Sequence, residues 1–268
     1  MSSILHIRNC TAYRGPTPVF TDLTLQIDEG QHTVILGPNG AGKSTFLKLI
    51  TQEIRPVVQP GSFVRLFGQE RWNVWQLRDR LGMISDDLQN EYLPGATGEH
   101  VILSGFYSSI DIAPHHSFSQ AQIDKARAVM EELDITDLKD REYGKMSTGQ
   151  KRRFLLGRAL IHDPQVLVLD EPSSGLDLKA VQTYFSHIHQ LMRSGKTIIL
   201  VTHHISEIPP EISRVILLRE GRIIRDGGKK ELLTSETLSA LYGTPIQVIH
   251  SGGYYQVLPD TTAPAAGT

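Results

Sequence analysis

The sequence predicts an α/β protein with a mainly parallel sheet, and two patterns carry this prediction. Short apolar runs that fit buried strands recur along the chain, at 32–36, 166–169 and 196–202. Segments with the spacing of helices alternate with these runs, at 43–50, 150–161 and 178–193. Such alternation favours parallel strands joined by helices that cover both faces of the sheet.

Two further strand regions flank this core. Near the N-terminus, apolar residues alternate with polar ones, as in a half-buried strand, at Leu23, Leu25 and Ile27. Toward the C-terminus, a short strand pair is expected over 215–227, with its turn at Glu220-Gly221.

The segment 87–144 interrupts the strand-rich chain and has helical character. Within it, Ser119 and Gln122 have the spacing of a capping box at a helix start. We therefore expect a helical subdomain here, inserted into one domain that spans 1–259. The tail 260–268, rich in Thr, Pro, Ala and Gly, is expected to be disordered.

Composition excludes several classes of protein. The 268 residues are 40% hydrophobic and 21% charged, which is typical of a soluble globular chain. With 27 Lys+Arg against 29 Asp+Glu, there is no basic excess of the kind that marks nucleic-acid binders. No apolar stretch is long enough to span a bilayer, and no signal-peptide pattern opens the chain. The single cysteine, Cys10, suits a reducing compartment, so a cytoplasmic protein is expected.

A glycine-rich loop between the first core strand and its helix matches the phosphate-loop pattern G-x-x-x-x-G-K-S/T. Its glycines allow backbone N–H groups and the helix start to point at phosphate oxygens. Lys43 is expected to contact the β- and γ-phosphates, and Ser44 to place its hydroxyl on Mg²⁺. The predicted phosphate-binding residues are Gly37, Pro38, Asn39, Gly40, Ala41, Gly42, Lys43, Ser44 and Thr45.

A pair of carboxylates follows the apolar run 166–169. Asp170 is expected to support the Mg²⁺ shell, and Glu171 to orient or deprotonate the attacking water. An Asp-Glu pair after an apolar strand is also common in surface turns, so its meaning depends on the phosphate loop upstream.

Between these two motifs lies Met146-Ser147-Thr148-Gly149-Gln150, followed by a helix. Here the chain resembles the ATP-binding cassette (ABC) ATPase family, whose signature at this place is usually Leu-Ser-Gly-Gly-Gln. The resemblance covers nearly the whole chain and implies a P-loop NTPase (RecA-like) core, an antiparallel β subdomain, and ATP and Mg²⁺ as ligands. It also implies a head-to-tail homodimer on ATP binding, in which Ser147, Gly149 and Gln150 reach the ATP of the other copy. Thr148 stands where the family has glycine, so the closure of one cassette over the ATP of the other is expected to be weaker or differently tuned.

Three further residues match the family in order along the chain. Tyr13 stands at the place of the aromatic residue that stacks on adenine, although a tyrosine at such a place is by itself more often just part of a strand. Asp177 ends a segment similar to the loop that crosses between two cassettes. His203 resembles the switch histidine that senses the γ-phosphate, whereas its neighbour His204 matches no family role.

The clearest departure from the family concerns the lid glutamine that touches Mg²⁺ and transmits nucleotide state to a membrane partner. Asp86 stands at the aligned position, and Gln89 follows three residues later. A carboxylate can still approach Mg²⁺, so Asp86 joins Ser44 and Asp170 as an expected metal ligand. The coupling role of this segment is left open.

Other polar groupings read as structural. His115-His116 and His187-Ile188-His189 have no third ligand at metal spacing and are expected to be surface histidines. Lys151-Arg152-Arg153 is expected to decorate the signature helix rather than to contact nucleic acid, while Trp72 and Trp75 are expected to be packing residues.

The resemblance implies an ATPase in which Glu171, His203 and Lys43 are catalytic. The favoured function is the cytosolic energy-coupling subunit of a membrane transporter, at the inner face of the cell membrane, with permease subunits as partners and no nucleic acid. Short segments at 85–88 and 103–110 are similar to molybdenum-transport-associated cassettes, and the segment 238–258 is similar to metal-chelate importer ATPases. The alternative is a soluble ABC ATPase that regulates or remodels a macromolecule. A GTPase is disfavoured because the base-reading motif N-K-x-D is absent.

Overall fold

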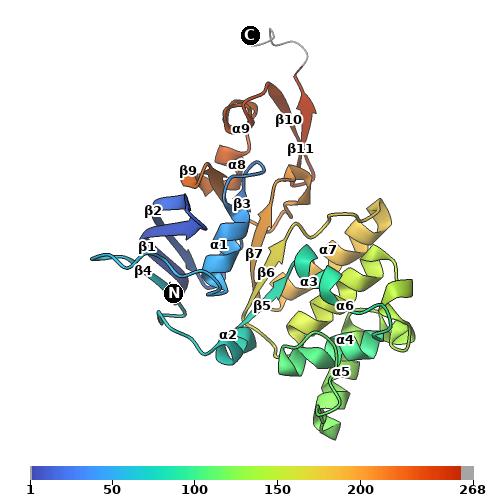
Figure 1. Cartoon of the computed structure of the whole chain (residues 1–268). Coiled ribbons are helices and arrows are strands. Elements are labelled where there is room, and N and C mark those ends of the chain that lie inside the picture. The colour runs from blue at the N-terminus through green and yellow to red at the C-terminus, as the bar shows by residue number, and fades with distance from the viewer. Residues whose placement is uncertain (1, 261–268) are drawn as a thin grey trace. The chain divides into compact units, whose positions relative to one another are not determined.

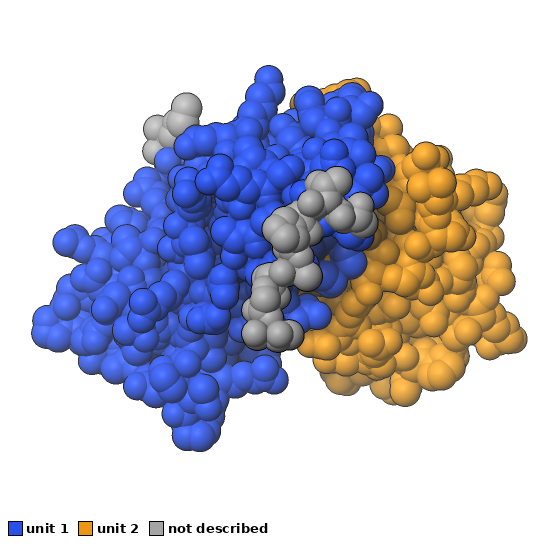
Figure 2. Space-filling view, turned by 90° about the horizontal axis from the view of Figure 1, so that it is seen from above, with its two compact units in different colours: residues 1–72, 199–268 blue, residues 73–198 orange. Residues whose placement is uncertain are grey.

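The computed structural model describes residues 2–260, which form two compact units (Figure 2). The first unit runs to Trp72 and resumes at Ile199, and the second comprises Asn73–Ile198. Within the described range, no helix is both long and apolar enough to cross a bilayer. The expected tail lies outside the described residues except for Asp260.

An antiparallel sheet forms the N-terminal part of the first unit. Its strands are β1 (Ser3–Arg14), β2 (Thr17–Asp28) and β4 (Phe63–Leu66), in the order β2-β1-β4. The alternation predicted from the sequence is confirmed, because the apolar residues are buried and the polar ones between them exposed, as for Leu25 and Gln26.

Parallel strands make the rest of the first unit's core. The strand β3 (Thr33–Leu36) pairs in parallel with β7 (Thr197–Thr202), which begins in the second unit, and with β8 (Arg214–Arg219). All four residues of β3 are buried, as expected of a strand covered on both faces. The strand β9 (Arg222–Gly228) returns antiparallel to β8 through the predicted turn at Glu220-Gly221.

The C-terminal part of the first unit contains a hairpin that the sequence did not reveal. After α8 (Lys229–Leu232) and α9 (Ser235–Tyr242), β10 (Ile246–Ser251) and β11 (Tyr254–Pro259) pair antiparallel beside α9 (Figure 1). The turn between the strands consists of Gly252 and Gly253, both with positive φ.

The second unit is mainly helical. It contains one parallel strand pair, β5 (Leu81–Ile84) with β6 (Val166–Asp170). Its α-helices are α2 (Val74–Arg80), α3 (Asp86–Glu91), α4 (Gly98–Ser104), α5 (Gln120–Glu132), α6 (Thr148–Leu160) and α7 (Leu178–Arg193). The capping box predicted at the start of α5 is confirmed. Helices α4, α5 and α6 pack together (Figure 1) around Gly157, where a Cβ atom would lie 2.4 Å from Ile102 Cδ1.

Three expectations about single side chains were wrong. His187 is 4% exposed rather than on the surface, because it lies on the face of α7 that also buries Tyr184, Ile188 and Leu191. Trp75 is 54% exposed rather than packed. Arg152 is fully buried, because a carboxylate from another helix pairs with it.

Candidate nucleotide site

The loop between β3 and α1 (Lys43–Ile50) is shaped by its glycines. Gly40 and Gly42 have φ of 82° and 107°, in the left-handed region that glycine adopts without strain. At the loop's start, a Cβ atom on Gly37 would lie 2.1 Å from the carbonyl oxygen of Leu218 in β8. The loop therefore makes a tight turn, here called the curl, at the carboxyl end of the parallel strand β3.

The start of α1 fits an anion. Gly42 is its N-cap and offers no side-chain hydrogen bond, and the first turn contains no acidic residue. The N–H groups of a first helical turn have no partner within the helix, and the helix dipole adds partial positive charge there. Phosphate groups are the ligands that such a start attracts.

The ammonium group of Lys43 lies within this curl. Its Nζ donates to the carbonyl oxygens of Gly37 at 2.8 Å and Pro38 at 3.3 Å, and the residue is 8% exposed. The neighbouring Ser44 is exposed, so its hydroxyl is accessible for a metal ion. The loop thus combines a lysine held at its centre with a hard oxygen donor beside it.

The carboxylate pair follows a fully buried run. Residues 166–169 of β6 are buried, Asp170 ends the strand half-buried, and Glu171 adopts a φ of 45°. A non-glycine residue in the left-handed region is uncommon and often marks a functional turn. The amide of Ser174 donates to the carbonyl oxygen of Glu171 at 3.1 Å, which closes that turn.

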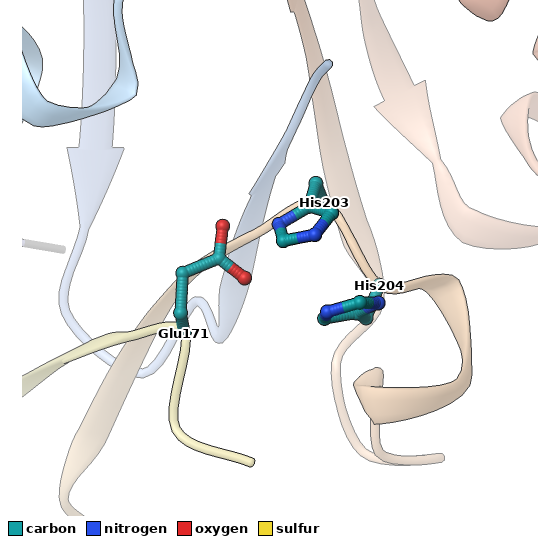
Figure 3. A group of neighbouring side chains, drawn as sticks. All are labelled: Glu171, His203 and His204. Carbon is teal, nitrogen blue, oxygen red and sulfur yellow. The ribbon is translucent and has the colours of Figure 1, made fainter. Parts of the chain in front are cut away.

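The two histidines follow β7. Their ring centroids are 3.8 Å apart, with planes inclined by 40°. Figure 3 shows the side chains on their elements, with Glu171 in the turn after β6 and His203 and His204 in the turn after β7. A hydrogen bond from the Tyr242 hydroxyl to the carbonyl oxygen of His203, at 3.0 Å, fixes the backbone here.

Sequence reasoning assigned Tyr242 no contact with His203, and it did not predict the surroundings of the loop after β7. Glu207 accepts a 2.7 Å hydrogen bond from the hydroxyl of Thr202, and the amide of His204 donates to that same hydroxyl. A cavity of about 300 Å³ is lined by His203, His204, Ile205, Ser206, Gln256 and Val257. No local motif signals the contact of Tyr242 with His203, because the two residues are 39 positions apart.

The signature segment forms the start of α6. Ser147 is the N-cap: its Oγ accepts from the amide of Gln150 at 3.3 Å, and Gln150 Oε1 accepts from the amide of Ser147 at 3.0 Å. Gly149 lies against α7, because a Cβ atom there would be 2.7 Å from Ala180 Cβ. Asp177 caps α7, with a carboxylate oxygen accepting from the amide of Ala180 at 2.8 Å. The structure therefore brings the signature start and the Asp177 segment together within the second unit.

The remaining two predicted residues have different surroundings. Tyr13 lies near the end of β1, opposite Pro18, with 44% of its surface exposed, so its ring is accessible for stacking. Asp86 is the first residue of α3, and its carboxylate forms an ion pair with Arg152 of α6. In this structure that carboxylate therefore binds a guanidinium group.

Comparison with known proteins identifies the family. Residues 20–174 match the sequence profile of the ABC transporter family. The ABC transporter ATP-binding protein YlmA of Bacillus subtilis is 32% identical over 251 residues, which cover 92% of this chain and 93% of that protein. The cobalt import ATP-binding protein CbiO of Rhodobacter capsulatus is 31% identical, over 87% of this chain and 81% of that protein.

Solved structures agree on the fold. The structure of CbiO1 from Clostridium perfringens, described as part of the ABC transporter complex CbiONQ, superposes with a TM-score of 0.73 and is 25% identical. It covers 90% of this chain and 94% of CbiO1, so the predicted P-loop NTPase fold is confirmed. The chain therefore belongs to the ABC transporter family, as one of its ATP-binding, ATP-hydrolysing cassettes.

Proposed function

We propose that this cassette is the energy-coupling subunit of a membrane transporter, and that it works at the inner face of the membrane as a head-to-tail homodimer around two MgATP. The observation that carries the ATP-binding part of the proposal is the start of α1, a helix N-terminus without a side-chain cap whose first residue is Lys43. Relatives named as a cobalt import ATP-binding protein and as part of a transporter complex support permease subunits as partners.

The residues of the phosphate loop divide the work of binding ATP. Backbone N–H groups from Gly40 to Thr45 and the ammonium of Lys43 hold the phosphates, and the exposed ring of Tyr13 stacks on adenine. The Ser44 hydroxyl and the Asp170 carboxylate are hard oxygen donors that would hold Mg²⁺. Bound there, Mg²⁺ would neutralise charge on the phosphate oxygens.

Hydrolysis is assigned to the residues after β6 and β7. The Glu171 carboxylate orients the attacking water and accepts its proton, and His203 donates a hydrogen bond to the γ-phosphate. Ser147, Gly149 and Gln150 of a second copy contact that phosphate from the other side, and Asp177 lies in the loop that meets the second copy. Two cassettes are therefore needed to complete each site.

Replacing Glu171 with Gln tests this proposal. The amide keeps the size of the side chain but cannot accept the proton, so hydrolysis should fall by about a hundredfold to ten-thousandfold while ATP binding persists. Unable to turn over, the variant should elute as a dimer with MgATP and as a monomer without it. Glu131→Gln, an exposed glutamate on α5, is the matched control. Wild-type turnover in purified Glu171→Gln would overturn the assignment.

A second candidate function is a regulatory or remodelling ATPase with no membrane partner. The observation that favours it is Asp86 at the lid position, where the family's glutamine couples to permeases. Steady-state ATPase activity with and without membranes that contain candidate permeases separates the two. Stimulation by a permease supports the transporter, and indifference to every permease together with co-purification of a macromolecule supports the second candidate.

A further inference from the structure

The ion pair between Asp86 and Arg152 joins the segment after β5 to the signature helix. Asp86 opens α3 after its N-cap Ser85, and Arg152 lies in the second turn of α6, five residues after the N-cap Ser147. Both residues belong to the second unit. The pair is therefore a direct link between α3, the lid segment that begins at Asp86, and the helix whose start carries the signature.

The burial of Arg152 makes this link unusual. Its side chain is completely buried, whereas the side chain of Asp86 is 44% exposed. Among the described residues, Nε and Nη1 of Arg152 are buried without a hydrogen-bond partner, and Nη2 is the nitrogen that meets Asp86. A buried guanidinium retains its charge, and removing the single partner of a buried charge is strongly destabilising.

We propose that Asp86 is a positioning residue, which holds Arg152 and so fixes the start of α6 relative to α3, and that it is not a Mg²⁺ ligand. This inference rests on the proposed function only in that the start of α6 contacts ATP. The carboxylate is bound to a cation inside its own unit, and a metal ion that drew charge from it would weaken its pairing with the buried Arg152. A shift of the lid segment would move Arg152, and with it the first turns of α6.

Unfolding without nucleotide tests the pair itself. Asp86→Asn should lower the midpoint of thermal unfolding by roughly 5 to 15 °C, because it strands a buried charge. Arg152→Met, added to Asp86→Asn, should recover most of that loss, since a buried apolar side chain replaces the unpaired cation. Asp87→Asn, the exposed neighbour on α3, is the matched control and should leave the midpoint unchanged. Equal midpoints for Asp86→Asn and Asp87→Asn would overturn the proposal.

Kinetics then separate positioning from a purely structural role. Asp86→Asn should lower kcat about tenfold, with the KM for ATP and the Mg²⁺ concentration for half-maximal activity unchanged, and Asp86→Glu should restore most of the rate. The double variant Asp86→Asn/Arg152→Met should regain stability but keep the low kcat, because the link is absent. If Asp86→Asn does not fold, Arg152→Met alone should show the same low kcat.

Two kinetic results would contradict the proposal. A higher Mg²⁺ requirement in Asp86→Asn would make the carboxylate a metal ligand, and recovery of kcat in the double variant would make the pair merely structural. Failure of the proposed function reads out differently: Glu171→Gln would then keep wild-type turnover, while the unfolding results for Asp86 and Arg152 would stand.

Discussion

The starts of α1 and α6 are both assigned to phosphate, yet they are built in opposite ways. At α1 the N-cap is Gly42 in a left-handed conformation, with no side-chain hydrogen bond to the helix. At α6 the N-cap Ser147 and Gln150 satisfy each other in a complete capping box. A helix start that lacks a cap is ready for an external anion, whereas a capped start already has partners for part of its N–H groups.

The difference teaches how the two ends divide their roles. We expect the start of α1 to gain hydrogen bonds when ATP binds and so to supply binding energy within one copy. At α6, the amides of Ser147 and Gln150 already donate within the capping box, to Gln150 Oε1 and Ser147 Oγ, so fewer N–H groups remain for a phosphate and the expected gain is smaller. We expect α6 to act mainly in closure, and changes at the two starts to have different consequences.

The largest expected effect is at α1. Lys43→Ala removes the ammonium held in the curl of the loop, and charge-assisted hydrogen bonds to phosphate of this kind are worth about 1.5–3 kcal/mol each. The affinity for ATP should fall by about a hundredfold in an equilibrium titration. Lys48→Ala, an exposed lysine in the last turn of the same helix, should bind ATP normally. An unchanged affinity for ATP in Lys43→Ala would contradict the role of the start of α1 in binding phosphate.

A packing change should affect the other helix start. Gly149→Ala places a Cβ atom 2.7 Å from Ala180 Cβ, so α6 and α7 must separate, at a cost of about 1–3 kcal/mol in the free energy of unfolding. Denaturation with urea in the absence of nucleotide measures this loss. Gly95→Ala, at a glycine of the same unit with nothing within 4 Å of its Cβ position, should lose much less.

A matched pair of serines sharpens the contrast. Ser147→Ala deletes the N-cap of α6 and should cost about 1 kcal/mol of stability without ATP. Ser44→Ala removes an exposed hydroxyl that caps nothing, and its stability without ATP should stay within about 0.5 kcal/mol of wild type. An equal loss in both variants would show that the two helix starts are stabilised alike.

The smallest expected effect is on the pH dependence of stability, through His187 on α7, the helix that packs against α6. Burial lowers the pKa of His187 on α7 below its ordinary value, with the charge of Arg153 on α6 acting in the same direction and Asp134 opposing it. Below the ordinary histidine pKa of about 6.5, the unfolded chain binds a proton that the folded chain does not. Stability should therefore fall as pH drops through 6.5, and His187→Leu should make this fall shallower in unfolding measured from pH 7.5 to 5.5.

Much of the fold followed from local periodicity. The apolar runs that became β3 and β6 and the helical spacing of α1 and α7 are properties of short windows, and tertiary context did not override them. The phosphate loop could also be predicted from a short window, because its whole pattern lies within nine positions. What the sequence hid depends on distant partners: the burial of Arg152 requires Asp86, 66 residues away, and the His203 backbone is fixed by Tyr242. His187 was misread because it was paired with His189 rather than with the buried face of α7.

The central claim, that the start of α1 in one copy and the start of α6 in another hold the same ATP, can be tested by cross-linking. Cys10 is buried, and burial raises its pKa to about 11, so engineered cysteines at Asn39 and Thr148 would be the reactive ones. Each is placed alone in the Glu171→Gln background and treated with a thiol cross-linker long enough to span a nucleotide. We predict that the mixture of Asn39→Cys and Thr148→Cys proteins gives a covalent dimer with MgATP, and that neither protein does so alone. Equal cross-linking of either protein alone, or no covalent dimer from the mixture with MgATP, would contradict the account.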